Sequence, residues 1–526
     1  MQRFLTALIL TVSCAAVSAT AASAATGFTF SNTPGKYPVG LRVKQQYDYT
    51  RVYKTRIDLS TAQPTSGERA RPIQALVWYP AAATGKANGN AKPLLYRDYL
   101  ATMATETDFT LTLEAAAKST AAFIARQARH SALAVQESTR PMWAVRDAAE
   151  QSGKFPVLIY APSLSASAME NADLCEYLAS HGYLVLSSAS VGPRSRAMTS
   201  DLEGLEGQVA DIGFLIAQAQ GLAQADMGRI GVIGFSWGGL ANAMAAAKDD
   251  RIGALVSLDG SMRGYREFID GGKDSAKYVT PARLAVPLLY MGKRPLTVEA
   301  LQRREIQTEF SIMNRMVYSD VYIGTMNPMN HGDFASDSLR FAPDLDFDEY
   351  SREEAALAHS WTMRYVHRFL DAYLKQDAAA LAFLNNAPKQ NGVPAHMLAM
   401  DIRRAKGAPP TMENFVGLLA RDGFAQAIPA YTRLHAQDAS FALDPNRLNT
   451  WGYELMRAGR GRDALEIFKL ATHLYPTEGN LFDSLAESYD NTGDKAQAIA
   501  NYKRARELDP GNKNALARLK ALGAIP

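Results

Sequence analysis

The chain has 526 residues, of which 47% are hydrophobic and 21% charged; this composition is ordinary for globular proteins, and the length allows two or more domains. The formal net charge is +3, from 56 Lys and Arg against 53 Asp and Glu. Because the net charge is small and the sequence contains no block of basic residues, we do not expect nucleic acid as a partner.

Residues 1–24 form the first recognisable element. Arg3 precedes an apolar run over residues 4–12, and the segment ends in the small-residue triplet Ala-Ser-Ala. This pattern is typical of a secretory signal peptide, and its apolar run is too short to cross a membrane. We therefore expect an exported protein, periplasmic or secreted, whose mature chain begins near Ala25 and contains no integral membrane segment.

Three regions follow with different patterns. Residues 26–80 resemble short strands separated by Pro, Gly and Ser, and residues 108–151 form an Ala-rich helical insertion. From residue 155 to about 374, apolar runs such as FPVLIYA, YLVLSSA and RIGVIGF alternate with helical patterns. Continuous apolar strands joined by helices predict a mostly parallel sheet that is covered on both faces.

The sequence GFSWG, residues 234–238, follows one of these strands and opens a helix rich in Gly and Ala. This is the G-x-S-x-G pattern of the nucleophile elbow of α/β-hydrolases, in which a tight turn lifts a serine hydroxyl out of the sheet edge. The N-terminus of the following helix favours developing negative charge near that hydroxyl. The pattern therefore predicts Ser236 as a nucleophile.

A serine nucleophile needs a base, and the chain order in this fold is serine, acid, histidine. Of the eight histidines, His331 lies in the loop sequence MNPMNHGDF, directly after the last strand-like segment of the alternating region. The other histidines precede Ser236, lie on an expected helix, or fall outside this region. We therefore expect His331 to be the general base.

Three carboxylates are candidates for the acid. Asp259 ends the strand that follows Ser236 in the sequence ALVSLDGSM. Glu299 is the nearest carboxylate after the next strand, where many α/β-hydrolases keep the acid, and Asp333 lies two residues from His331. Asp259 is favoured, because Asp333 is too close in sequence to reach back to the ring and Glu299 lies several residues beyond its strand.

Residues 155–337 resemble the secreted platelet-activating-factor acetylhydrolase and dienelactone hydrolase-like families. The resemblance rests on FPVLIYAPSLSA, LASHGYLVLSSAS, IGVIGFSWGG, VSLDGSM and HGDFASD. It implies Asp259 as the acid and an oxyanion hole made by the backbone N–H groups of Trp237 and Leu164, where side-chain identity matters little. The chain departs from these families after the first core strand, where it has Pro-Ser in place of their usual His-Gly.

A second domain is expected at the C-terminus, over residues 411–526, joined by a linker over residues 376–410. Two of its segments repeat at a spacing of 34 residues, which pairs Gly459 with Gly493, Ala464 with Ala498, Phe468 with Tyr502, Ala471 with Ala505, and Pro476 with Pro510. This period resembles tetratricopeptide repeats, and residues 415–434 contain a degenerate earlier unit. The expected architecture is an α/β-hydrolase domain over residues 25–375 followed by an all-α, tetratricopeptide-like domain.

The predicted function is that of an exported serine hydrolase that cleaves an ester, or a related acyl bond, of a small molecule through a Ser-His-Asp triad and an acyl-enzyme. No metal-ligand spacing and no Gly-rich phosphate loop occurs in the sequence, so no cofactor or metal is expected. The C-terminal repeats are candidates for binding a protein partner. Two alternatives remain open: a peptidase on the same fold, and a catalytically idle scaffold whose repeats carry the function.

Overall fold

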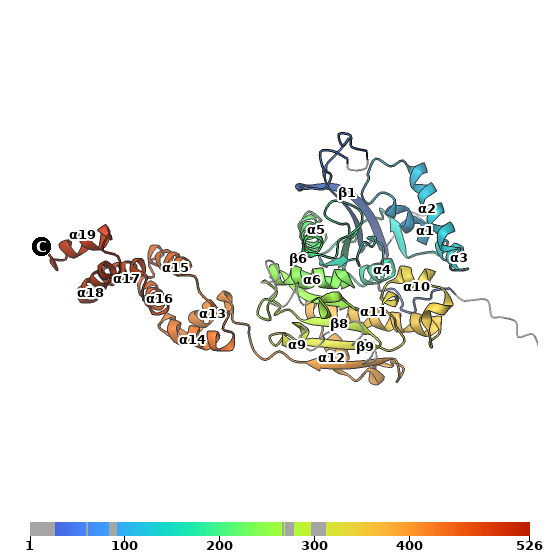
Figure 1. The fold of residues 1–526 in the computed structure, drawn as a ribbon. Helices are drawn as coiled ribbons and strands as arrows, with labels where there is room; N and C mark the ends of the chain where they lie inside the picture. Colours follow the sequence, from blue (N-terminus) through green and yellow to red (C-terminus); the bar gives the residue numbers. More distant parts are fainter. Residues whose placement is uncertain (1–26, 59–60, 84–91, 266–267, 269–277, 296–311) are drawn as a thin grey trace, which may run out of the picture.

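The computed structural model describes residues 27–58, 61–83, 92–265, 268, 278–295 and 312–526 (Figure 1). The expected leader and Glu299 lie outside these residues. In the part of the chain that the structure describes, no helix is both long and apolar enough to cross a membrane.

The core is a ten-stranded sheet in the order β10-β9-β8-β7-β6-β4-β5-β2-β1-β3. From β9 to β5 the six central strands run parallel, whereas β2, β1 and β10 join by antiparallel pairing. The strands are Val39–Val52 (β1), Ala70–Pro80 (β2), Ala144–Arg146 (β3), Phe155–Ala161 (β4), Leu184–Ser188 (β5), Ala225–Phe235 (β6), Ile252–Leu258 (β7), Leu288–Lys293 (β8), Val321–Met326 (β9) and Leu398–Arg403 (β10).

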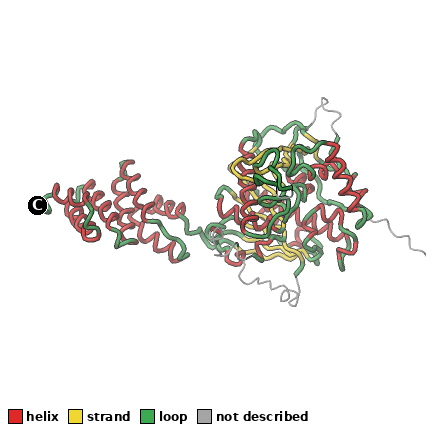
Figure 2. Tube along the Cα trace, turned by 45° about the horizontal axis from the view of Figure 1, so that its top comes forward, coloured by secondary structure: helices red, strands yellow, loops and turns green. Residues whose placement is uncertain are grey.

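Helices cover both faces of this sheet (Figures 1 and 2). On one face α4 (Ala172–Ser180) and α11 (Arg352–Leu374) pack in one apolar cluster, and on the other α5 (Leu202–Gln220) and α6 (Trp237–Lys248) pack in a second. Every residue of β4 is buried, as expected of a parallel strand covered on both sides. The predicted α/β-hydrolase fold is confirmed.

The expected insertion over residues 108–151 contains α2 (Leu113–Gln127) and α3 (Ala134–Ser138), and α1 (Tyr96–Met103) precedes it. Its last part is not helical, because β3 pairs in parallel with β1 and forms an edge of the sheet. The helix α3 contacts α10 (Ser336–Phe341), which follows the loop of His331. The insertion therefore lies beside the candidate site.

The segment 376–410 differs from the expected linker. It forms α12 (Ala378–Asn385) and then β10, which pairs along its whole length with β9, from Leu398 opposite Met326 to Arg403 opposite Val321. This pairing satisfies the backbone groups of β9, which otherwise would form the edge of the sheet. The sheet domain thus extends through β10, beyond the expected boundary at residue 375.

The C-terminal region is all-α and projects away from the sheet domain (Figure 1). Its helices are Met412–Asp422 (α13), Ala427–Gln437 (α14), Pro445–Arg457 (α15), Gly461–Leu474 (α16), Gly479–Thr492 (α17), Lys495–Leu508 (α18) and Lys513–Ala521 (α19). Both α17 and α18 begin 34 residues after α15 and α16, respectively. The small and aromatic residues of this repeat are fully buried: Ala464, Ala498, Phe468, Tyr502, Ala471 and Ala505.

Candidate active site

Ser236 occupies a strained turn between the end of β6 and the start of α6. Its backbone has φ 52° and ψ −117°, a conformation that a side-chain-bearing residue rarely adopts and that is often found at functional sites. A Cβ on Gly234 would lie 2.3 Å from the carbonyl oxygen of Gly238, and a Cβ on Gly238 would lie 2.0 Å from that of Ala161. Only glycine fits at either position, so the two glycines make the elbow possible.

Three side chains from separate loops meet at this turn. His331 Nε2 lies 2.9 Å from Ser236 Oγ, and His331 Nδ1 lies 2.5 Å from Asp259 Oδ2. With the ring proton on Nδ1, histidine donates to the carboxylate and accepts the serine hydroxyl proton. The structure thus brings the three expected catalytic residues into one continuous hydrogen-bond chain.

The carboxylate of Asp259 is held at the ends of β7 and β8. Its backbone N–H donates to Met291 O at 2.6 Å, and its Oδ1 accepts the backbone N–H of Lys293 at 3.2 Å. The ammonium of Lys293 lies 4.0 Å from Oδ2. Burial and the charge of Asp259 raise the pKa of the neighbouring Tyr290. These contacts leave Oδ2 directed at the His331 ring.

Ring packing and hydrogen bonds also hold the loop that contains His331. The ring packs against Phe235, with 5.0 Å between the ring centroids. Asp333 Oδ2 accepts the backbone N–H of Asn330 at 2.6 Å, and the Asp333 carbonyl lies 2.8 Å from Nδ1 of the buried His359. Burial raises the pKa of Asp333 to about 6 and lowers that of His359 to about 4. The Asp333 carboxyl group therefore stabilises the loop of His331, and the partner of the His331 ring is Asp259.

The two expected oxyanion-hole residues come from adjoining strand ends, because β4 pairs directly with β6. Trp237 is the first residue of α6, where a backbone N–H has no partner within the helix. Its buried indole packs edge-on against Tyr265, with 5.5 Å between ring centroids. Leu164 is 44% exposed in the loop after β4, and the next residue, Ser165, has a positive φ of 60°.

A cleft of about 620 Å³ adjoins the triad. Its lining includes Asn330 and Gly332, which flank His331, and Ser165 and Ala166 from the loop after β4. Apolar side chains complete it, among them Leu100, Met103, Phe123 and Phe341. Concave surfaces of mixed polarity are typical of small-molecule binding sites.

A larger cavity of about 1020 Å³ lies elsewhere, between the sheet domain and the C-terminal helices. Its lining includes Lys248 at the end of α6, Arg283, Met412 and Arg447. Ser236, His331 and Asp259 line neither space, but only the smaller cleft is lined by the residues on either side of His331. Within the described ranges no group of three or more His, Cys, Asp or Glu is arranged to hold a metal ion. The candidate active site is therefore the smaller cleft.

Sequence analysis did not single out the residues that hold the loop after β4. The carboxyl groups of Glu106 and Glu170 are both buried against this loop, and Asn171 joins it to the loop of His331. Isolated Glu and Asn residues are most often exposed, and no spacing pattern distinguishes these three from the rest of the chain.

A match to a known protein family supports a hydrolase. Residues 73–297, less than half of the chain, match the Peptidase_S15 family, described as X-Pro dipeptidyl-peptidase (S15 family). No curated protein matches the chain. A solved structure of a ferulic acid esterase from Streptomyces cinnamoneus is similar with a TM-score of 0.44 and 18% identity, covering 69% of this chain and 97% of that one. The family match and the observed fold support a serine hydrolase of the α/β fold.

Proposed function

We propose that this chain is an exported serine hydrolase that cleaves a carboxylic ester, or a related acyl bond, of a small molecule. The observation that carries the proposal is the hydrogen-bond chain from Ser236 through His331 to Asp259. A serine hydroxyl is a weak nucleophile by itself, and an adjacent base oriented by a third group is what activates it.

In the proposed reaction Ser236 Oγ attacks the carbonyl carbon of the ester while His331 Nε2 takes the hydroxyl proton. The tetrahedral intermediate then collapses, the bond to the leaving alcohol breaks, and the His331 imidazolium returns the proton to that alcohol. Water, deprotonated by the same nitrogen, hydrolyses the acyl-enzyme and regenerates the hydroxyl. Asp259 keeps the ring in the competent tautomer and stabilises the imidazolium.

The oxyanion of the intermediate is proposed to bind the backbone N–H groups of Trp237 and Leu164. The support for Trp237 is its place at the first position of α6, where the N–H is free of helical bonding and the helix dipole favours negative charge. The support for Leu164 is the adjacency of β4 and β6, which puts both loops at one edge of the sheet.

A peptidase is the second candidate, and the match to the X-Pro dipeptidyl-peptidase family favours it. A panel of p-nitrophenyl esters of increasing acyl length, measured beside X-Pro p-nitroanilides, separates the two. We expect hydrolysis of the esters, with a preference for one range of acyl length, and an Asp259-dependent rate. Faster turnover of the anilides would identify a peptidase, and hydrolysis of neither, without covalent capture by a fluorophosphonate, would indicate an idle scaffold.

Export and partner binding belong to the same proposal. The leader-like residues 1–24 support cleavage near Ala25, which N-terminal sequencing of the exported protein tests; a retained Met1 would contradict it. The repeat of α15 and α16 in α17 and α18 supports a tetratricopeptide-like array, which we propose binds a protein partner.

A further inference from the structure

The loop after β4, residues 162–168, is held by a buried carboxyl group. Glu170 is 3% exposed, and its Oε2 accepts the backbone N–H of Ser163 at 3.0 Å and the Tyr160 hydroxyl at 2.8 Å. The Ser163 hydroxyl forms a hydrogen bond with the other oxygen, Oε1. Both oxygens of Glu170 are thus used to fix the residue directly before Leu164.

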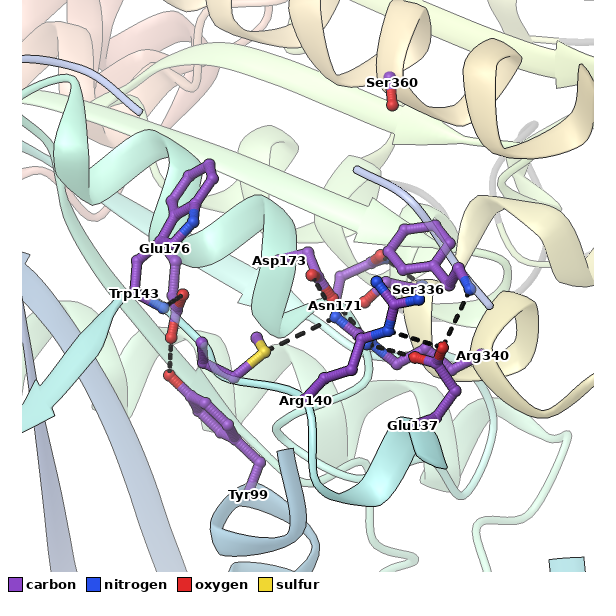
Figure 3. Close-up of polar contacts among 12 residues, drawn as sticks. Tyr99, Glu137, Arg140, Trp143, Asn171, Asp173, Glu176, Ser336, Arg340 and Ser360 are labelled. Atoms are coloured by element: carbon purple, nitrogen blue, oxygen red, sulfur yellow. Dashed lines mark hydrogen bonds and ion pairs between the residues drawn. The ribbon is translucent and has the colours of Figure 1, made fainter. Parts of the chain in front are cut away.

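The same short segment also holds the loop that follows His331. The Glu170 carbonyl accepts the backbone N–H of Asp337 at 3.2 Å. Asn171 accepts the backbone N–H of Ser336 at 2.9 Å (Figure 3). It also donates to Phe334 O at 2.9 Å. Residues 170 and 171 therefore connect the expected oxyanion loop to the histidine loop.

We propose that Glu170 is a positioning residue that fixes the backbone N–H of Leu164 relative to Ser236 and His331. This inference rests on the proposed function, since it assigns a role in the same reaction. A displaced N–H weakens binding of the developing oxyanion, which exists only in the transition state and intermediate. Loss of the Glu170 contacts is therefore expected to lower kcat while leaving KM nearly unchanged.

The protonation state of Glu170 makes the inference specific. Burial, with the nearby charge of Asp337, raises the pKa of Glu170 well above its ordinary value. A neutral carboxyl group can donate its proton to Ser163 Oγ while Oε2 accepts from Ser163 N and Tyr160. Glutamine reproduces this pattern, with its amide N–H in place of the carboxyl proton, and alanine removes it.

The far end of the loop is supported independently. Glu106 accepts the Ser167 hydroxyl at 2.5 Å and the backbone N–H of Ala168 at 3.0 Å. Arg196 donates to Ser165 O at 2.9 Å and pairs with Glu106 at 2.8 Å. These contacts remain when Glu170 is changed, so we expect a local displacement at Ser163 and Leu164 and a folded protein.

Glu176, on the helix α4 that follows Glu170, provides a matched control. It is also buried, and it accepts the Tyr99 hydroxyl at 2.6 Å and the backbone N–H groups of Trp143 at 2.6 Å and Ala144 at 3.1 Å (Figure 3). These contacts reach α1 and β3, and none of them reaches the triad or the loop after β4. Glu176→Ala therefore removes a comparable buried carboxyl without touching the loop after β4.

The experiment measures kcat and KM for p-nitrophenyl acetate, the Kd of a trifluoromethyl ketone transition-state analogue, and Tm, for Glu170→Gln, Glu170→Asp, Glu170→Ala and Glu176→Ala. We expect Glu170→Gln to stay within about threefold of wild type. Glu170→Ala and Glu170→Asp should lower kcat roughly 10- to 100-fold and weaken the analogue by a similar factor, below the ~10² to 10³ cost of removing an oxyanion donor outright. Glu176→Ala should lower Tm with kcat unchanged.

Wild-type kcat in folded Glu170→Ala would overturn the inference, as would an equal loss of kcat in Glu176→Ala. If Glu170→Ala does not fold, Glu170→Asp decides, because its shorter side chain withdraws from Ser163; unchanged kcat and analogue affinity would then count against the assignment. A wild-type protein that neither hydrolyses esters nor binds the analogue contradicts the proposed function itself, and with it this inference.

Discussion

Asp259 Oδ2 lies 2.5 Å from His331 Nδ1, and the backbone N–H of Lys293 donates to the other oxygen of the same carboxylate. Asp259 thus lies at the end of β7, and a hydrogen bond from the last residue of β8 fixes its carboxylate. In Asp259→Asn the amide oxygen can still accept from Lys293, but the amide N–H donates to Nδ1 and holds the His331 ring in the wrong tautomer. We expect kcat to fall roughly 10⁴-fold, as in other triads, with Tm close to wild type.

Asp333→Asn is the matched comparison, because its amide oxygen can still accept the N–H of Asn330. We expect less than about a tenfold loss of kcat, since this carboxyl supports the loop and does not contact the ring nitrogen of His331. Glu299→Gln completes the series. A larger loss at Asp333 or Glu299 than at Asp259 would reassign the acid.

The close packing around the turn at Ser236 predicts that a single added methyl group at Gly238 lowers the activity strongly. A Cβ on Gly238 would lie 2.0 Å from Ala161 O, so the turn or β4 must move. We expect Gly238→Ala to lower kcat/KM by more than about 100-fold, because a displacement near 1 Å already costs about that much in an oriented site. Esterase assays and thermal unfolding measure both consequences.

The control is Gly213→Ala in α5, where an added Cβ meets nothing within 4 Å. Replacing a helical glycine by alanine is expected to raise the free energy of unfolding by about 0.5–1 kcal/mol and to leave kcat unchanged. Equal activities of the two variants would show that close packing at Gly238 does not shape the elbow.

His359 should make a contribution to stability that is lost as the pH is lowered below about 6.5, whereas buried carboxyls such as Asp333, whose pKa is raised to about 6, contribute with the opposite sign. Burial lowers the pKa of His359 from 6.5 to about 4, so between these values the unfolded chain binds a proton that the folded chain does not. The contribution of His359 to the free energy of unfolding therefore decreases with falling pH, by about 3 kcal/mol at most. His181, whose pKa burial also lowers to about 4, contributes with the same sign.

His359→Asn tests the assignment, since its amide N–H can replace the ring Nδ1–H that donates to Asp333 O. In urea unfolding between pH 4 and 7, the free energy of unfolding of wild type should fall relative to that of the variant as the pH is lowered. Identical slopes would show that His359 does not remain neutral in the folded protein.

The C-terminal helices should be dispensable for chemistry. Helices α13 to α16 share an apolar cluster of their own, and no triad residue lies beyond His331. A chain ending at Gly407 keeps β10 and should retain kcat within about threefold. A chain ending at Lys375 loses β10 and exposes the edge of β9, so we expect aggregation or a lowered Tm. Loss of activity in a folded chain ending at Gly407 would show that the helices shape the site.

The sequence predicts those features of the fold and the site whose geometry depends on residues close together in the chain. The elbow at Ser236 is one, because Gly234 and Gly238 are required by contacts within a few residues. The six parallel strands are another, since burial on both faces demands continuous apolar runs. The sequence favours Asp259 among three carboxylates, because Asp259 ends the strand that follows Ser236 in the chain.

Other features depend on contacts between distant segments. The edge strand β10 has alternating exposed and partly buried residues, so it lacks the apolar run of a central strand, and its place follows from pairing with β9. Glu170 looks like an ordinary helix-flanking residue in the sequence. Its carboxyl group holds Ser163 and Tyr160, and its carbonyl accepts the backbone N–H of Asp337, more than 160 residues later in the chain. No local pattern reveals this second contact.

The most direct test of the account is covalent labelling of Ser236. Wild type and Ser236→Ala are treated with a fluorophosphonate, digested and analysed by mass spectrometry, with p-nitrophenyl acetate hydrolysis measured in parallel. We predict one adduct on the wild-type peptide that contains GFSWGG, with loss of both the adduct and the hydrolysis in the variant. Undiminished labelling and turnover of Ser236→Ala would contradict the assignment of the nucleophile.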